Sequence, residues 1–101
     1  GSVYVADVVK DYLVNIVAAT RSHDAVRLGA SPRASLHLIR TARAKAALAG
    51  RDYVIPDDVQ AMAIPVLAHR LLPSTRAQLD GISPVDIVSQ ILTSTPVPEQ
   101  A

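Results

Sequence analysis

The stretch Leu28-Gly29-Ala30-Ser31-Pro32-Arg33-Ala34 predicts a connection that ends abruptly in a helix. Gly29 favours a turn, and Ser31 is a good N-cap because its side-chain oxygen can accept a hydrogen bond from a free backbone N–H. Pro32 suits the first helical position, where its missing N–H costs nothing. The sequence therefore predicts a helix that starts at Ser31 and Pro32 and continues until Gly50, which can end it.

Before this start, hydrophobic residues recur at three- and four-residue steps over residues 4–21 and predict a first helix. Residues 22–31 are expected to connect the two helices. The inward face of the first helix is expected to carry Val5, Val8, Val9, Tyr12, Leu13, Ile16 and Ala19.

After Gly50, residues 53–55 are expected to be extended, because residues that precede a proline avoid the helical region. Pro56 then opens a third helix at its first turn. Pro65 lies inside the apolar stripe of this helix and is expected to kink or split it near residue 64.

Residues 72–83 predict a loop, and Ser83-Pro84 repeats the cap-and-proline start for a last helix. The complete pattern predicts an all-α fold, a small bundle of four to five helices. Residues 1–2 are interpreted as a scar of tag removal, residues 3–95 as the helical domain, and residues 96–101 as a flexible C-terminal tail.

Composition excludes several classes of site. The 101 residues include no Cys, which excludes disulfides and thiolate zinc sites and fits a reducing cytosol. The net charge of +1 gives no whole-domain attraction for DNA or an acidic membrane. The longest apolar run, Ala61 to Ala68, is too short to cross a bilayer. The three His residues lack metal-ligand spacing, and no glycine-rich phosphate loop is present, so no metal site and no complete active site are predicted.

The start of the second helix is basic. Arg33, His37 and Arg40 fall at i, i+4 and i+7 and are expected to share one face. A cation in the first turn is unfavourable for the helix itself, yet a guanidinium beside free backbone N–H groups binds phosphate well. Two interpretations stay open from the residues alone: Arg33 binds an anion, or it pairs with an acid such as Asp24 on a solvated helix face.

The stretch from Leu28 to Ala34 closely resembles the sensor-2 motif of the MoxR family of AAA+ ATPases. The flanking segments agree in order, and the resemblance covers about Val3 to Pro98. These segments are Ala19-Thr20-Arg21, Ala42 to Leu48, Arg51 to Val59, and Val66 to Leu71. The resemblance implies that the chain is the small helical lid that lies C-terminal to an α/β nucleotide-binding domain.

The same resemblance implies the roles of particular residues. Arg33 would reach the γ-phosphate of ATP as the sensor-2 arginine. Ser31 and Pro32 would set the helix start that aims Arg33, and Gly29 and Ala30 would permit close approach near the nucleotide, so residues 29–33 would bind the cofactor. ATP, with its Mg²⁺, would be held by the upstream domain, so the chain would not be an enzyme by itself.

The partners implied by the resemblance are the chain's own upstream core, neighbouring subunits of a ring that is usually hexameric, and proteins with von Willebrand A domains. Family members are thought to act as cytoplasmic chaperones that insert metals or mature protein complexes. Neither a nucleic acid nor a membrane is among these partners.

Two alternatives remain from the residues. A DNA-binding module would place Arg33, His37, Arg40 and Arg43 in a groove of the duplex, although the near-neutral charge disfavours it. A protein-interaction module would use exposed leucines, for which Leu71, Leu72 and Leu79 are candidates.

Overall fold

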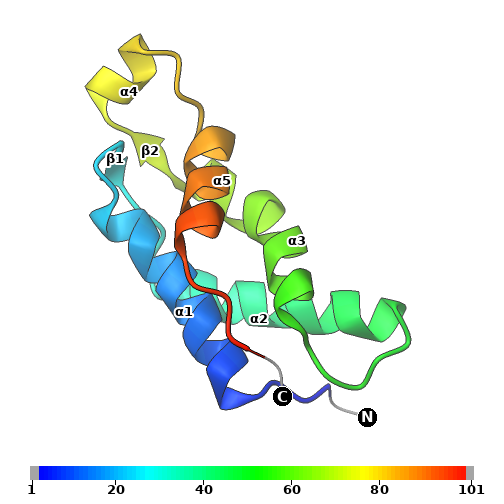
Figure 1. Ribbon diagram of the computed structural model, residues 1–101. Helices are drawn as coiled ribbons and strands as arrows, with labels where there is room; N and C mark the ends of the chain where they lie inside the picture. The colour runs from blue at the N-terminus through cyan, green and yellow to red at the C-terminus, as the bar shows by residue number, and fades with distance from the viewer. Residues whose placement is uncertain (1–2, 100–101) are drawn as a thin grey trace.

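The computed structural model describes residues 3–99 and contains five α-helices, one turn of 3-10 helix (η1) and two short strands (Figure 1). The fold is helical, as predicted, and the number of helices agrees. In chain order the elements are α1 Asp7–Ser22, β1 Val26–Leu28, α2 Arg33–Leu48, α3 Pro56–Leu67, η1 Ala68–Arg70, β2 Leu72–Pro73, α4 Thr75–Leu79 and α5 Pro84–Ser94.

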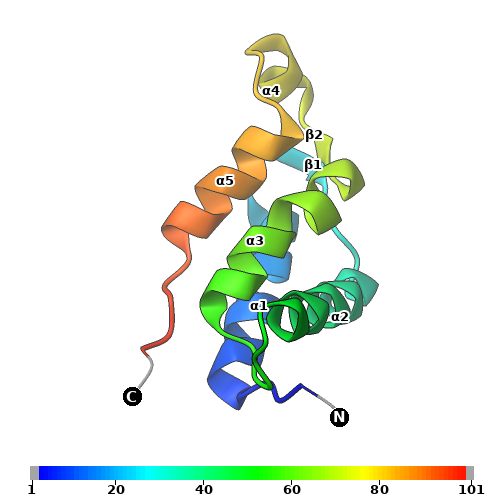
Figure 2. The same cartoon turned by 90° about the vertical axis from the view of Figure 1, so that its right-hand side faces the viewer.

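The core lies where α1, α2, α3 and α5 meet, and α3 packs against both α2 and α5 (Figures 1 and 2). Small side chains on the inner face of α2 let the helix backbones approach closely, and larger aliphatic side chains from the other helices fill the remaining space. The buried α2 residues are Ala34, Leu38, Ala42 and Ala46, and they meet Ile16, Val59, Leu67 and Ile87 among others in one core cluster.

The predicted start of the first helix at residue 4 is wrong. Tyr4 is extended and pairs with the segment before α3: its N–H donates to the Asp52 carbonyl (2.8 Å), and its carbonyl accepts from Val54 N–H (2.9 Å). The predicted inward position of Val8 is also wrong, because Val8 is 53% exposed. The same pairing confirms that the segment before Pro56 is extended.

The predicted loop over residues 72–83 contains two elements that the sequence pattern did not indicate. β2 pairs antiparallel with β1, and α4 follows, capped by the Ser74 side chain, which accepts from Ala77 N–H (3.0 Å). α4 lies at one end of the elongated molecule, and the start of α1 lies at the other (Figure 1).

The ends of the remaining helices follow local chemistry. Gly50 has a φ of +80°, which suits the residue just beyond the end of α2. Ser83 Oγ accepts from Asp86 N–H (3.1 Å), and Asp86 Oδ2 accepts from Ser83 N–H (2.9 Å), which confirms the predicted start of α5. Hydrogen bonding of the carboxylate, first to the Ser83 backbone and then to its side chain, favours the charged form and lowers the pKa of Asp86.

Pro65 does not split α3, which continues unbroken to Leu67, so the predicted split near residue 64 is wrong, while the predicted kink stays a prediction. Pro65 is exposed, and water can solvate the backbone carbonyl that loses its partner on that side.

After α5, Pro96, Val97 and Pro98 lie along α1 and line a groove on it. The predicted flexibility of the tail stays a prediction; residues 1–2, interpreted as a scar, and residues 100–101 lie outside the described residues.

Candidate functional site

A basic groove lies at the N-terminal end of α2. Arg33, Leu36, His37 and Arg40 line it from α2, and Arg70 lines it from η1; the groove has a volume of about 220 Å³. The predicted common face of Arg33, His37 and Arg40 is therefore confirmed. No carboxylate lines this groove, so its lining is polar and positively charged.

Arg33 is the first residue of α2 and its side chain is exposed. Within residues 3–99, ion pairs join Arg51 to Asp58 and Arg76 to Asp80, and neither involves Arg33. The alternative in which Arg33 pairs with Asp24 is therefore wrong for this structure. The guanidinium is left without an acidic partner at the positive end of a helix dipole, where an anion would be favoured.

The start of α2 differs from the prediction in one respect. Pro32 occupies the capping position with helical dihedral angles, and the Ser31 side chain makes no capping hydrogen bond. Backbone carbonyls serve instead: Ser31 O accepts from Ala34 N–H (2.9 Å) and Pro32 O accepts from Ser35 N–H (3.1 Å). Ser31 as N-cap and Pro32 as the first helical residue are therefore wrong, because the chain enters α2 through a tight turn whose own carbonyls satisfy these N–H groups.

The end of α1 holds the backbone just before α2. The Thr20 hydroxyl donates to Val17 O (2.6 Å) and accepts from Ala30 N–H (3.0 Å), and Arg21 Nη1 donates to Ala30 O (2.9 Å). Both backbone polar groups of Ala30 are thus bonded to α1. We call these contacts of Thr20 and Arg21 with Ala30 the α1 clamp, and they fix the direction in which α2 leaves the connection.

Gly29 is required by the same packing. A Cβ atom built on Gly29 would lie 2.4 Å from the Thr20 carbonyl oxygen, which is backbone and cannot swing away. Ala30 is almost fully enclosed, at 1% exposure. The structure therefore gives Gly29 and Ala30 a role in packing α2 against α1, while their contact with a nucleotide, like that of Ser31 and Pro32, stays a prediction.

Two functional positions were missed from the sequence. Thr20 was not assigned to the interior, although it is fully buried, and Arg70 was not placed beside Arg33. The available signal for Thr20 was a threonine at the end of an apolar stripe, four residues after Ile16. No local signal could have found Arg70, because η1 meets α2 only through the packing of α3.

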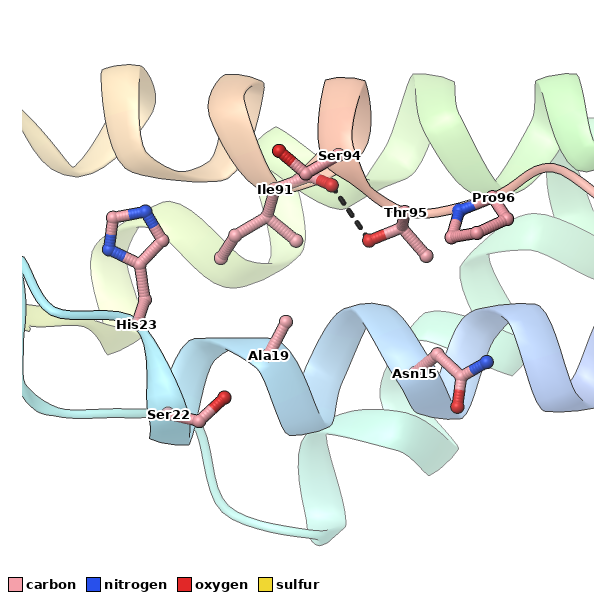
Figure 3. Close-up of a pocket in the computed structure, with 8 residues that line it drawn as sticks. All are labelled: Asn15, Ala19, Ser22, His23, Ile91, Ser94, Thr95 and Pro96. Atoms are coloured by element: carbon pink, nitrogen blue, oxygen red, sulfur yellow. Dashed lines mark hydrogen bonds between the residues drawn. The ribbon is translucent and has the colours of Figure 1, made fainter.

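A second groove, between α1 and α5, has a volume of about 350 Å³ and is shown in Figure 3 with His23 at one end and Pro96 at the other. His23 Nδ1 accepts from Ala25 N–H (3.0 Å), so Nε2 carries the proton and donates to Gln90 Oε1 (2.8 Å). His23 thus ties the end of α1 to α5.

Within residues 3–99, no three His, Asp or Glu side chains are placed to hold a metal ion, and no helix is both long enough and apolar enough to cross a membrane.

The sequence model of the AAA lid domain family matches residues 18–91, and the chain belongs to that family. Its relatives include MoxR proteins, so the resemblance seen in the sequence is confirmed. The chain is 42% identical to Chaperone MoxR1 of Mycobacterium tuberculosis over 98 residues, 88% of this chain and 26% of that protein.

Two further comparisons cover nearly the whole chain. The chain is 46% identical to YeaC of Bacillus subtilis over 94 residues, which are 93% of this chain and 29% of YeaC. The crystal structure of a candidate ATPase from Cytophaga hutchinsonii superposes with a TM-score of 0.90 at 31% identity, over 97% of this chain and 32% of that one. The chain thus spans about a third or less of the relatives it matches.

Replacing Thr20 by valine should destabilise the chain by about 1–3 kcal/mol, because the buried Ala30 N–H loses its acceptor while the side-chain shape is kept. Urea unfolding followed by circular dichroism measures this change. Thr93→Val is the matched control, since Thr93 makes the same type of bond to the preceding helical turn but is exposed and accepts nothing. Equal losses for the two variants would contradict the α1 clamp.

Replacing Gly29 by alanine should cost about 1–3 kcal/mol, because the new methyl group overlaps the Thr20 carbonyl and forces α2 away from α1. Gly81→Ala is the control: Gly81 has a φ of +75° in open space, so alanine there strains one residue without touching the groove. In ¹H–¹⁵N spectra, Gly29→Ala should shift the amides of Thr20, Ala30 and Arg33, and Gly81→Ala should leave them in place. Unshifted amides in Gly29→Ala would show that the close approach does not set the position of α2.

Proposed function

We propose that this chain is the lid of an ATP-hydrolysing protein, and that it closes over ATP bound to a nucleotide-binding core that precedes it. Arg33 reaches the γ-phosphate and stabilises the charge that develops there during phosphoryl transfer. The observation that carries the proposal is an exposed guanidinium at the first turn of α2, with no acidic partner in residues 3–99 and with its helix held by the α1 clamp.

The chemistry of the groove fits a phosphate chain and does not fit a magnesium site. Guanidinium groups are phosphate ligands, whereas Mg²⁺ needs carboxylate or other oxygen ligands, and the groove offers no carboxylate. In this proposal the core holds ATP and Mg²⁺ and supplies the remaining catalytic groups. The lid contributes Arg33, with Gly29 to Pro32 next to the nucleotide, and has no catalytic activity of its own.

The wider role follows the relatives. The Mycobacterium tuberculosis relative is named a chaperone, which supports a chaperone role. We extend this role to the maturation of partner proteins or the insertion of metals into them. The lid would pack on its own core and on the next subunit of a cytoplasmic, hexameric ring. Proteins with von Willebrand A domains would be its partners outside the ring.

The exposed leucines support a contact with a neighbouring subunit. Leu79 on α4 is 79% exposed and Leu72 is 42% exposed, as predicted, whereas Leu71 is buried, so the prediction that Leu71 is exposed is wrong. The DNA-binding alternative is disfavoured by the net charge of +1, which gives no broad attraction for a duplex. The deciding experiment is ATP turnover of the core-plus-lid protein with and without Arg33.

A further inference from the structure

Arg70 contributes a further guanidinium to the basic groove. It is the last residue of η1, and its Nε donates to the Val66 carbonyl (3.0 Å), one turn back along the chain. Within residues 3–99, the two Nη groups of Arg70 make no hydrogen bond. A bond through Nε restricts the side chain and leaves these terminal donors available at the groove.

The groove gathers positive charge without compensation. Arg33, Arg40 and Arg70 line it together with His37, and no acid lines it. Three arginines outside the groove are compensated, since Arg51 and Arg76 pair with carboxylates and Arg21 donates to a backbone carbonyl, whereas no carboxylate lines the groove. Like charges in one groove repel each other, so this arrangement is stabilised when an anion binds between them.

We propose that Arg70 is a second phosphate-binding residue, which binds the same polyphosphate chain as Arg33 from the opposite element of the groove. The inference rests on the proposed function in assigning this polyphosphate to a nucleotide. A small anion suits the groove better than a duplex does, because its volume is about 220 Å³ and the remaining cations of α2, Arg43 and Lys45, do not line it. The net charge of +1 also gives no broad attraction for DNA.

Binding from two elements has a structural consequence. Arg33 begins α2, whereas Arg70 ends the η1 turn that follows α3, and η1 packs against α5. A phosphate chain held by both residues would bridge the start of α2 to the end of α3. Loss of the terminal phosphate would remove that bridge. The contact between the start of α2 and the end of α3 would therefore depend on whether the lid binds a nucleoside triphosphate or a diphosphate.

The test is a titration of the ¹⁵N-labelled 101-residue chain with inorganic tripolyphosphate at low salt, followed through backbone amides and arginine Nε–H signals. We expect the Nε–H signals of Arg33 and Arg70 to move together, with a dissociation constant on the order of 1 mM that weakens as salt is added. Arg70→Ala and Arg33→Ala should each weaken binding by about two- to fivefold, the range for exposed charge pairs. Arg70→Lys, which keeps the charge, should lose less.

Arg76→Ala is the matched control, because Arg76 lies on α4, outside the groove, and pairs with Asp80. Its affinity should be unchanged, and thermal unfolding checks that every variant is folded. The inference would be overturned if the chain did not bind tripolyphosphate, or if folded Arg70→Ala bound it as tightly as the unmutated chain. It would also be overturned if the chain bound duplex DNA more tightly than tripolyphosphate and this binding depended on Arg43. Failure of the proposed function would look different: tripolyphosphate would bind through both arginines, while ATP turnover of the core-plus-lid protein would not depend on Arg33.

Discussion

Replacing Arg33 by alanine should lower ATP turnover of the protein that joins this lid to its core by roughly 30- to 1,000-fold. The reason is the loss of one charge contact that strengthens in the transition state, which is worth about 2–4 kcal/mol. Nucleotide binding should change much less than turnover, since the core would supply most contacts to ATP. Steady-state hydrolysis, combined with equilibrium binding of a fluorescent nucleotide, separates these two effects.

Two variants sharpen this measurement. Arg33→Lys keeps the charge but loses the forked guanidinium, so its turnover should fall between that of alanine and that of the unmutated protein. Arg76→Ala removes an exposed arginine of α4 that is already paired with Asp80, and its turnover should be unchanged. Unchanged turnover in Arg33→Ala would contradict the catalytic role of the lid, as would an unmutated protein that hydrolyses no ATP.

Replacing Asp58 by alanine should destabilise the chain by about 3–5 kcal/mol. Asp58 is 2% exposed; its Oδ1 pairs with Arg51, and its Oδ2 accepts from Ile55 N–H (2.9 Å) at the start of α3. Alanine would leave the guanidinium of the largely buried Arg51 without its only acceptor in residues 3–99 and would leave the Ile55 N–H without its acceptor. Thermal unfolding of a domain of this size should register the change as a fall of about 15 °C or more.

The neighbouring carboxylate provides the control. Asp57 also lies in the first turn of α3 but is exposed, so Asp57→Ala should remove only its interaction with the helix dipole, about 0.3–1 kcal/mol. Adding Arg51→Met to Asp58→Ala should recover part of the lost stability, because it removes the uncompensated cation. The assignment of the pair would be contradicted if Asp58→Ala cost no more than Asp57→Ala.

Local signals in the sequence were sufficient for most helices and for their ends. Ser83-Pro84 predicted the start of α5, and Gly50 predicted the end of α2, because both depend on neighbouring residues alone. The start of α1 was missed because Tyr4 pairs with a segment close to fifty residues further along the chain. Helical periodicity cannot distinguish such a distant backbone pair from one more turn of helix.

For the candidate site too, the sequence predicted the residues that local helix geometry brings together and missed those brought in by tertiary packing. Arg33, His37 and Arg40 share a face because of helix geometry, so their spacing was enough to predict the groove's α2 wall. Arg70 reaches the groove only because α3 packs along α2, and the α1 clamp forms only because the connection folds back onto α1. The motif around Ser31 was interpreted as a capped helix, whereas the strongest constraints on it come from the end of the previous helix.

The shape of the domain gives the α1 clamp a mechanical meaning. The molecule measures 46 × 23 × 20 Å, with α4 at one end of its long axis and the start of α1 at the other (Figure 1). Thr20 and Arg21 of α1 are hydrogen-bonded to Ala30 just before α2. We therefore expect α1 and α2 to move as one rigid unit. A rotation about the α1 end would therefore displace the opposite end of the long axis most, and this end holds α4, which carries the exposed Leu79.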